Sequence, residues 1–106
     1  MIEANHVLQA LGDPTRRAIF DRLALGPASI SHLAQPLGVT VTAVAQHIAV
    51  LEDCGLARSQ KVGRVRTCAL ATAGLDVLAR WIETKRPPLE QALDRLGDLL
   101  DEDEIL

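Results

Sequence analysis

Helix caps and helix breakers divide the first half of this chain into short segments, and that division constrains its fold more than any other feature. Asp13, followed by a proline, is typical of a helix start, because a proline at the first helical position loses no backbone hydrogen bond. Ser29 and Thr40 are candidate caps for two later helices, and Gly38 stands between them. With a short apolar segment before Asp13, the pattern predicts four helices, the last two joined by a glycine turn.

Beyond the fourth helix the pattern changes to strand-like alternation. The segments Leu56–Lys61 and Arg64–Leu70 are separated by Val62-Gly63, which we interpret as a two-residue hairpin turn. Two helices, a glycine turn and a hairpin are typical of a winged helix-turn-helix. We therefore predict a recognition helix at 40–54 and a wing at 56–70.

The remaining chain is expected to be helical and to need a partner. Leucine, isoleucine and tryptophan occur at helical spacing until Pro87-Pro88, which we expect to interrupt the helix. Four leucines follow at spacings of 4, 3 and 4, a seam that calls for a partner helix: Leu89, Leu93, Leu96 and Leu100. We predict one mainly α domain over 1–106 with a small β-hairpin, in the order α-α-α-α-β-β-α-α. Residues 1–11 and 72–101 would form a dimer interface.

The predicted recognition helix has two unlike faces. Val44, Ile48 and Leu51 cluster on one side at 100° per residue and should face the core. The opposite side presents Thr42 and Gln46 among small residues. Such a surface favours insertion into a major groove, because small side chains allow close approach while Thr and Gln can bond base edges. The alternative is an ordinary solvated helix face.

The charge distribution supports a nucleic-acid surface despite a formal net charge of −3. Residues 40–70 carry four cations against two acids, whereas residues 87–106 carry one cation against seven acids. Lys61, Arg64 and Arg66 lie at or beside the predicted hairpin tip, and alternation would place the two arginines on one face. Alternatively, these cations only protect a solvated sheet edge.

Four ordered segments carry a family resemblance: Ala10-Leu11-Gly12-Asp13-Pro14-Thr15-Arg16-Arg17-Ala18-Ile19, Leu33-Ala34, Val44-Ala45-Gln46-His47-Ile48 with Leu51-Glu52-Asp53-Cys54-Gly55-Leu56, and Gly63-Arg64-Val65-Arg66. Over about residues 5–100 the chain resembles the ArsR/SmtB family of bacterial winged-helix repressors. It looks most like the branch without metal-ligand motifs that is often encoded beside START-like proteins. The resemblance implies a homodimer that binds an inverted repeat in double-stranded DNA and represses nearby genes.

The resemblance also implies which residues contact DNA. Base contacts would come from the start of the fourth helix, at Thr40, Val41, Thr42, Ala45 and Gln46. His47 would have a mostly structural or phosphate-contacting role. The chain departs from the family where Ala45 replaces a common serine and where Thr67-Cys68 replaces a tyrosine pair. The first departure affects the preferred operator sequence, and the second implies lighter packing of the wing.

Signal sensing has weaker support in the sequence. The three histidines, His6, His32 and His47, fall on three different predicted helices, so we expect no metal site and no cofactor. With a Val62-Gly63 turn, Ala57 would pair with Cys68, which would bring the thiol of Cys68 toward that of Cys54. A thiol-redox-responsive repressor using these cysteines is therefore an alternative to two small buried apolar residues.

Other classes of protein fit the sequence less well. There is no run of about 18 apolar residues and no basic start followed by an apolar stretch, so we expect a cytoplasmic protein without a membrane span. No nucleophile–base pair or phosphate loop points to an enzyme. A winged-helix module that binds a partner protein and no DNA is the main rival interpretation.

Overall fold

The computed structural model describes residues 1–105, with side chains as far as residue 101. Its elements are α1 (Ala4–Gly12), α2 (Pro14–Leu23), β1 (Ala28–Ser29), α3 (Ile30–Leu37), α4 (Val41–Asp53), β2 (Ala57–Val62), β3 (Val65–Leu70) and α5 (Ala73–Ile105). The order confirms a mainly helical winged helix-turn-helix. It differs from the prediction in an added strand, β1, and in a single C-terminal helix.

The predicted helix caps form as expected. Asp13 accepts a hydrogen bond from the backbone N–H of Arg16 at 2.9 Å, and Thr40 accepts one from Ala43 at 3.0 Å. Ser29 caps α3 in the same way. Gly38 ends α3 with a φ of 65°, a left-handed conformation that glycine adopts without strain. Each cap satisfies an otherwise unpaired amide, which is why these short helices begin where the sequence predicts.

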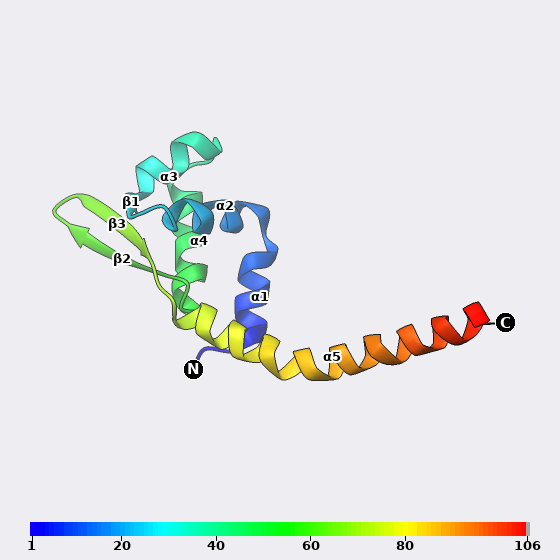
Figure 1. The fold of residues 1–106 in the computed structure, drawn as a ribbon. Helices are drawn as coiled ribbons and strands as arrows, with labels where there is room; N and C mark the ends of the chain where they lie inside the picture. The colour runs from blue at the N-terminus through cyan, green and yellow to red at the C-terminus, as the bar shows by residue number, and fades with distance from the viewer. Residues whose placement is uncertain (106) are drawn as a thin grey trace.

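The core lies where α1, α2, α3 and α4 meet the sheet (Figure 1). The predicted inner face of α4 is buried, with Val44, Ile48 and Leu51 at most 2% exposed. Leu75 and Leu78 from the start of α5 pack against the same core. We call residues 1–78 the body of the molecule.

The wing is part of a three-stranded antiparallel sheet in the order β1-β3-β2. Strand β1 pairs Ala28 with Cys68 and was missed in the sequence, because two residues cannot show alternation. The predicted turn is wrong by one position: Val62 pairs with Val65, so the turn residues are Gly63 and Arg64. Gly63 has a φ of 63°, and a left-handed glycine at the first turn position is typical of a type II′ turn.

This shift changes the cross-strand register by two residues. Ala57 faces Leu70 instead of Cys68, and Cys68 faces Ser59. Because side chains alternate between the two faces of a strand, Ser59, Lys61, Arg66 and Cys68 share the face that packs toward the helices.

Helix α5 continues through Pro87 and Pro88, so the predicted interruption is wrong. Each proline removes one backbone donor, but side chains from residue 81 to 96 are exposed, and water can reach the carbonyl groups left without a partner. The helix curves gently away from the body (Figure 1). We call residues 81–101 the far half of α5.

No single helix in the described chain is both long and apolar enough to span a membrane. Helices α3 and α4, which are bent by 112° relative to each other, would together be long and apolar enough, but by length and composition only.

Candidate DNA-binding surface

The first half of α4 brings most of the predicted reading residues to one exposed surface. Thr40, Thr42, Ala45 and Gln46 are all exposed, and Val41 is 51% exposed although it is apolar. The first turn of the helix contains no acidic residue. A helix N-terminus with small and uncharged polar side chains can approach a phosphate or the base edges of a major groove.

His47 lies apart from this reading surface. Its ring is half-buried, and its Nδ1 atom is 3.5 Å from Nη1 of Arg16 on α2. The same arginine donates hydrogen bonds to the carbonyl oxygens of Ala10 and Gln9 at the end of α1. Arg16 therefore connects α1, α2 and α4, and His47 belongs to this junction.

The three predicted cations of the wing are exposed, but they are arranged differently from the prediction. Arg64 occupies the turn, so it is Lys61 and not Arg64 that shares a strand face with Arg66. Lys61 and Arg66 are directly opposite each other across the strands. Two like charges in this position destabilise a hairpin, so these cations do not contribute to the stability of the wing by pairing with each other.

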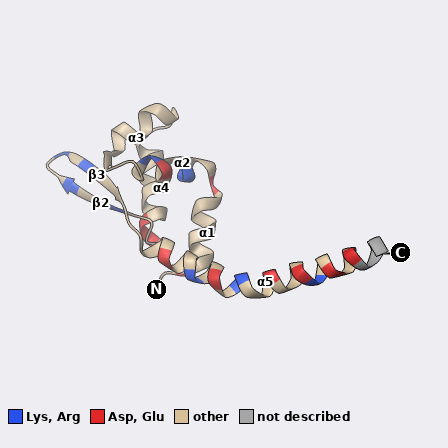
Figure 2. Ribbon diagram, in the orientation of Figure 1, with Lys and Arg blue, Asp and Glu red and all other residues tan. Residues whose placement is uncertain are grey.

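The charges divide along the molecule (Figure 2). All charged residues of strands β2 and β3 and of their turn are basic, whereas the acids of α4 are confined to its last two positions, Glu52 and Asp53. In the far half of α5, acidic residues outnumber basic ones by five to three. Local positive potential thus lies beside the reading face of α4, as a DNA-binding surface requires.

Sequence reasoning missed two polar contributors to this surface. The Oγ–H of Ser59 donates to Oε1 of Glu52 at 2.6 Å, and Nη1 of Arg66 donates to the same Ser59 oxygen at 3.1 Å. The predicted Val62-Gly63 turn already set Ser59 opposite Arg66, on one face, but the contact with Glu52 depends on how the hairpin folds back on α4.

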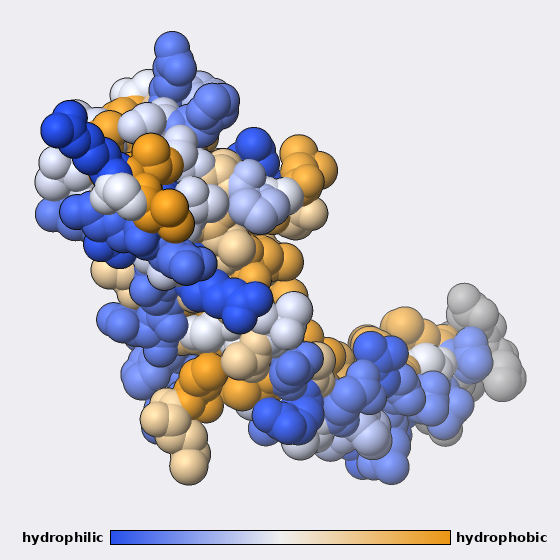
Figure 3. All heavy atoms as spheres, turned by 90° about the vertical axis from the view of Figure 1, so that its left-hand side faces the viewer, coloured by the Kyte–Doolittle hydropathy of each residue, from blue (hydrophilic) through white to orange (hydrophobic). Residues whose placement is uncertain are grey.

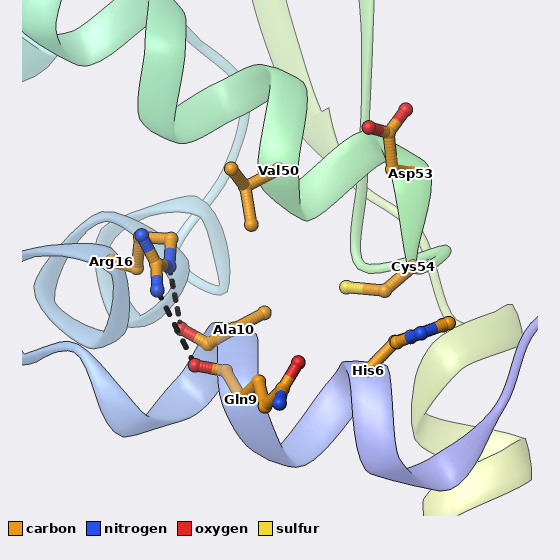
Figure 4. A pocket seen from close by; sticks show the side chains of 7 residues that line it. All are labelled: His6, Gln9, Ala10, Arg16, Val50, Asp53 and Cys54. Carbon is orange, nitrogen blue, oxygen red and sulfur yellow. Dashed lines mark hydrogen bonds between the residues drawn. The ribbon is translucent and has the colours of Figure 1, made fainter.

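A hollow of about 390 Å³ lies between α1, α2 and the end of α4 (Figure 4). The sulfur of Cys54 points into it from the end of α4, His6 lines it from α1, and Asp53 is at its rim. Among the described residues, no group of three His, Cys, Asp or Glu side chains is placed to hold a metal ion. The expectation of no metal site stays a prediction.

The two cysteines are buried and free. The Sγ atom of Cys54 donates to the carbonyl oxygen of Leu51 at 3.5 Å, and burial raises the pKa of both thiols above the usual value. The predicted pairing of Ala57 with Cys68 is wrong, because Cys68 lies opposite Ser59. The register argument that brought the thiols together therefore fails, and burial disfavours the reactive thiolate.

Comparisons with known proteins agree with this geometry. Residues 11–60 match a helix-turn-helix domain family. The chain is 44% identical over 70 residues to the HTH-type transcriptional regulator Rv2034 of Mycobacterium tuberculosis. That alignment covers 66% of this chain and 65%, just under two thirds, of the relative.

Many solved structures are similar to this chain, and two of them illustrate the likeness. An ArsR family transcriptional regulator, RHA00566, has a TM-score of 0.76 and 42% identity, covering 81% of this chain and 89% of that one. The homodimeric winged helix-turn-helix DNA-binding domain of Mb0332 from Mycobacterium bovis has a TM-score of 0.61 and 25% identity, covering 86% and 82%.

Proposed function

Since this chain belongs to the ArsR family of DNA-binding transcriptional regulators, we propose that it is a homodimeric repressor that binds an inverted repeat in operator DNA. The comparisons support a transcriptional regulator and not a winged-helix module that binds only protein. Within the family, we place the chain in the branch without metal-ligand motifs that is often encoded beside START-like proteins, and we propose that it needs no metal or cofactor. Its proposed location is the cytoplasm.

The first half of α4 is proposed to read the bases. Thr42 and Gln46 are exposed on one face and can donate to and accept from base edges, and Gln is suited to adenine. Thr40, Val41 and Ala45 surround them and are small enough to allow close approach. His47, held by Arg16, supports the helix or meets a phosphate at its edge.

The wing is proposed to bind the DNA backbone. Lys61, Arg64 and Arg66 are exposed cations on a segment without acids, beside the reading face. Phosphate contacts of this kind fix orientation and contribute affinity, but carry little base preference. They also make binding sensitive to salt, because each neutralised phosphate releases condensed counterions.

The second copy of the chain is proposed to cover the far half of α5. Its seam leucines are between 52% and 60% exposed: Leu89, Leu93, Leu96 and Leu100. An apolar edge is visible along this helix in Figure 3. A soluble monomer seldom leaves such a continuous apolar stripe exposed, and α1 packs beside the base of α5, where it can join the same interface.

The charges of α5 favour an antiparallel arrangement of two such helices. The part of α5 before Pro87 has a small basic excess, with Arg80, Lys85 and Arg86 against Asp76 and Glu83, and Glu83 pairs with Arg86 at 3.4 Å. Acidic residues dominate after Pro87, among them Asp94 and Asp98. Antiparallel pairing sets the acidic end of each helix beside the basic segment of the other. It also relates the two bodies by a twofold axis, so that two α4 helices can enter successive major grooves about 34 Å apart.

The observation that carries this proposal is the exposed Thr42–Gln46 face of α4 beside a wing that contains only basic charges. Footprinting on the DNA upstream of its own gene should show a protected inverted repeat. If the dimer neutralises about six to eight phosphates, log K should fall with log salt at a slope near −5 to −7.

Gln46→Ala should weaken binding to that site by roughly 1–3 kcal/mol and relax base preference at one position in each half-site, because an exposed base contact is lost. Gln91→Ala is the matched control, since Gln91 is exposed on the side of α5 opposite the leucine seam. If Gln46→Ala left affinity and base preference unchanged, the reading face would be misplaced.

A further inference from the structure

Ser59 connects the wing to the recognition helix through two hydrogen bonds. Its hydroxyl donates to Oε1 of Glu52 on α4 at 2.6 Å, and its oxygen accepts from Nη1 of Arg66 on β3 at 3.1 Å. A serine hydroxyl has one donor and two acceptor lone pairs, so it can serve both partners at once. A carboxylate and a guanidinium, from two different elements, thus share one hydroxyl group.

The result is that Arg66 is held at the side of α4. It lines a shallow hollow of about 250 Å³ together with Ala45 and Ala49, which belong to the exposed small-residue side of the helix. Among the described side chains, Lys61 and Arg64 take part in no comparable hydrogen bond. Of the three predicted wing cations, only Arg66 is therefore held by a hydrogen bond beside α4, whereas Lys61 opposite it and Arg64 in the turn are not held in this way.

Glu52 is otherwise hard to explain on this surface. An exposed carboxylate near bound DNA repels phosphates, and the acid could be omitted at no cost to the core, because its side chain is exposed. The Glu52–Ser59–Arg66 hydrogen bonds explain why an acid stands here. Glu52 accepts from Ser59, which in turn accepts from Arg66, and such charge-assisted hydrogen bonds are stronger than neutral ones and can restrain a long arginine side chain.

We propose that Glu52 and Ser59 are positioning residues that hold Arg66 beside α4, where its guanidinium meets the phosphate at the edge of the bound major groove. The inference rests on the proposed DNA-binding function. It assigns Arg66 a place next to the bases read by α4, and leaves other backbone phosphates to Lys61 and Arg64. Positioning of this kind raises affinity, because less side-chain freedom is lost on binding.

The test removes the hydroxyl group without changing any charge. Ser59→Ala should weaken operator binding roughly three- to tenfold, as loss of a hydrogen-bonded restraint on a charged group does. It should also make the salt slope less negative, although no charge has been removed, because the phosphate contact of Arg66 is weakened. Ser59→Thr keeps the hydroxyl and should restore both. Gln60→Ala, on the opposite face of the same strand, is the control.

A double-mutant cycle separates failure of this inference from failure of the proposed function. Arg66→Ala should reduce affinity and lower the magnitude of the salt slope by about 2 for the dimer. In that background Ser59→Ala should have no further effect. An undiminished effect of Ser59→Ala in the Arg66→Ala protein would overturn the positioning role while leaving DNA binding by the wing intact.

If Arg66→Ala itself changed neither affinity nor salt slope, the proposed role of Arg66 in DNA binding would fail, and the positioning role with it. If circular dichroism shows that Ser59→Ala disturbs folding, Glu52→Ala can take the place of Ser59→Ala in the double-mutant cycle. Glu52→Ala removes the hydrogen-bond acceptor of Ser59 from the exposed end of α4. A lack of coupling between Glu52→Ala and Arg66→Ala would then refute the inference.

Discussion

The body and the far half of α5 expose the same residue type to opposite extents. Leu51 and Leu56 in the body are 0% exposed, whereas Leu89 and Leu93 in the far half of α5 are 57% and 60% exposed. In the body, helices and sheet from one chain cover each other, so the hydrophobic gain is realised on folding. The far half of α5 has the apolar seam but no cover from its own chain. The difference shows that one region is covered within the monomer, whereas the other presents the surface on which we propose that a second copy packs.

The largest effect should come from placing a charge in the seam. Leu93→Glu should dissociate the dimer and weaken operator binding on the order of a hundredfold or more, because the second half-site is then no longer held at high effective concentration. Analytical ultracentrifugation and a binding titration measure the two losses. Gln91→Glu adds the same charge on the other side of the helix and should change neither. A dimer that survives Leu93→Glu would show that another surface joins the two copies.

A truncation inside the body should instead affect folding. Leu51→Ala should lower the free energy of unfolding by about 2–5 kcal/mol, because it opens a cavity among buried side chains from several elements. Urea denaturation of the protein measures this loss. Leu99→Ala, at a side chain that is 59% exposed, provides the comparison and should cost far less. Equal losses would contradict the division between the two regions.

The smallest effect concerns a cap in the body and depends on pH. The backbone N–H of Arg16 donates to Asp13 and lowers the pKa of that carboxyl, and the charges of Arg16 and His47 act in the same direction. A lowered pKa in the folded state stabilises the fold above the carboxyl's unfolded pKa. This contribution disappears as the pH falls through the folded value.

Asp13→Ala should therefore lower the thermal unfolding midpoint, and the decrease should be largest above roughly pH 4. The difference in midpoint between the native protein and the variant should become smaller as the pH is lowered. Asp13→Asn keeps a capping acceptor and removes the titration, so its midpoint should fall less steeply with pH than that of the native protein. A native-to-Ala difference that is constant from neutral to acidic pH would exclude a role for the Asp13 charge.

Local chemistry made much of the body predictable. Asp13, Ser29 and Thr40 cap helices where expected, because each interacts with an amide only three residues away. The inner face of α4 follows from helical periodicity. The sequence left the position of the hairpin turn uncertain by one residue, because Gly63 fits either the first or the second position of a two-residue turn. That single step moved Arg64 from the strand into the turn and moved Cys68 from opposite Ala57 to opposite Ser59.

The sequence by itself determined the order of the four helices before the wing, the buried and exposed faces of α4 and the segregation of charge, because caps, periodicity and composition act within a few residues. Only the tertiary structure decided the pairing of β1 with β3, the continuity of α5 through Pro87 and Pro88, and the Glu52–Ser59–Arg66 contact. These features join residues that are distant in sequence or depend on the solvent exposure of a long helix. Their energies are set by packing and hydration, which no local pattern records.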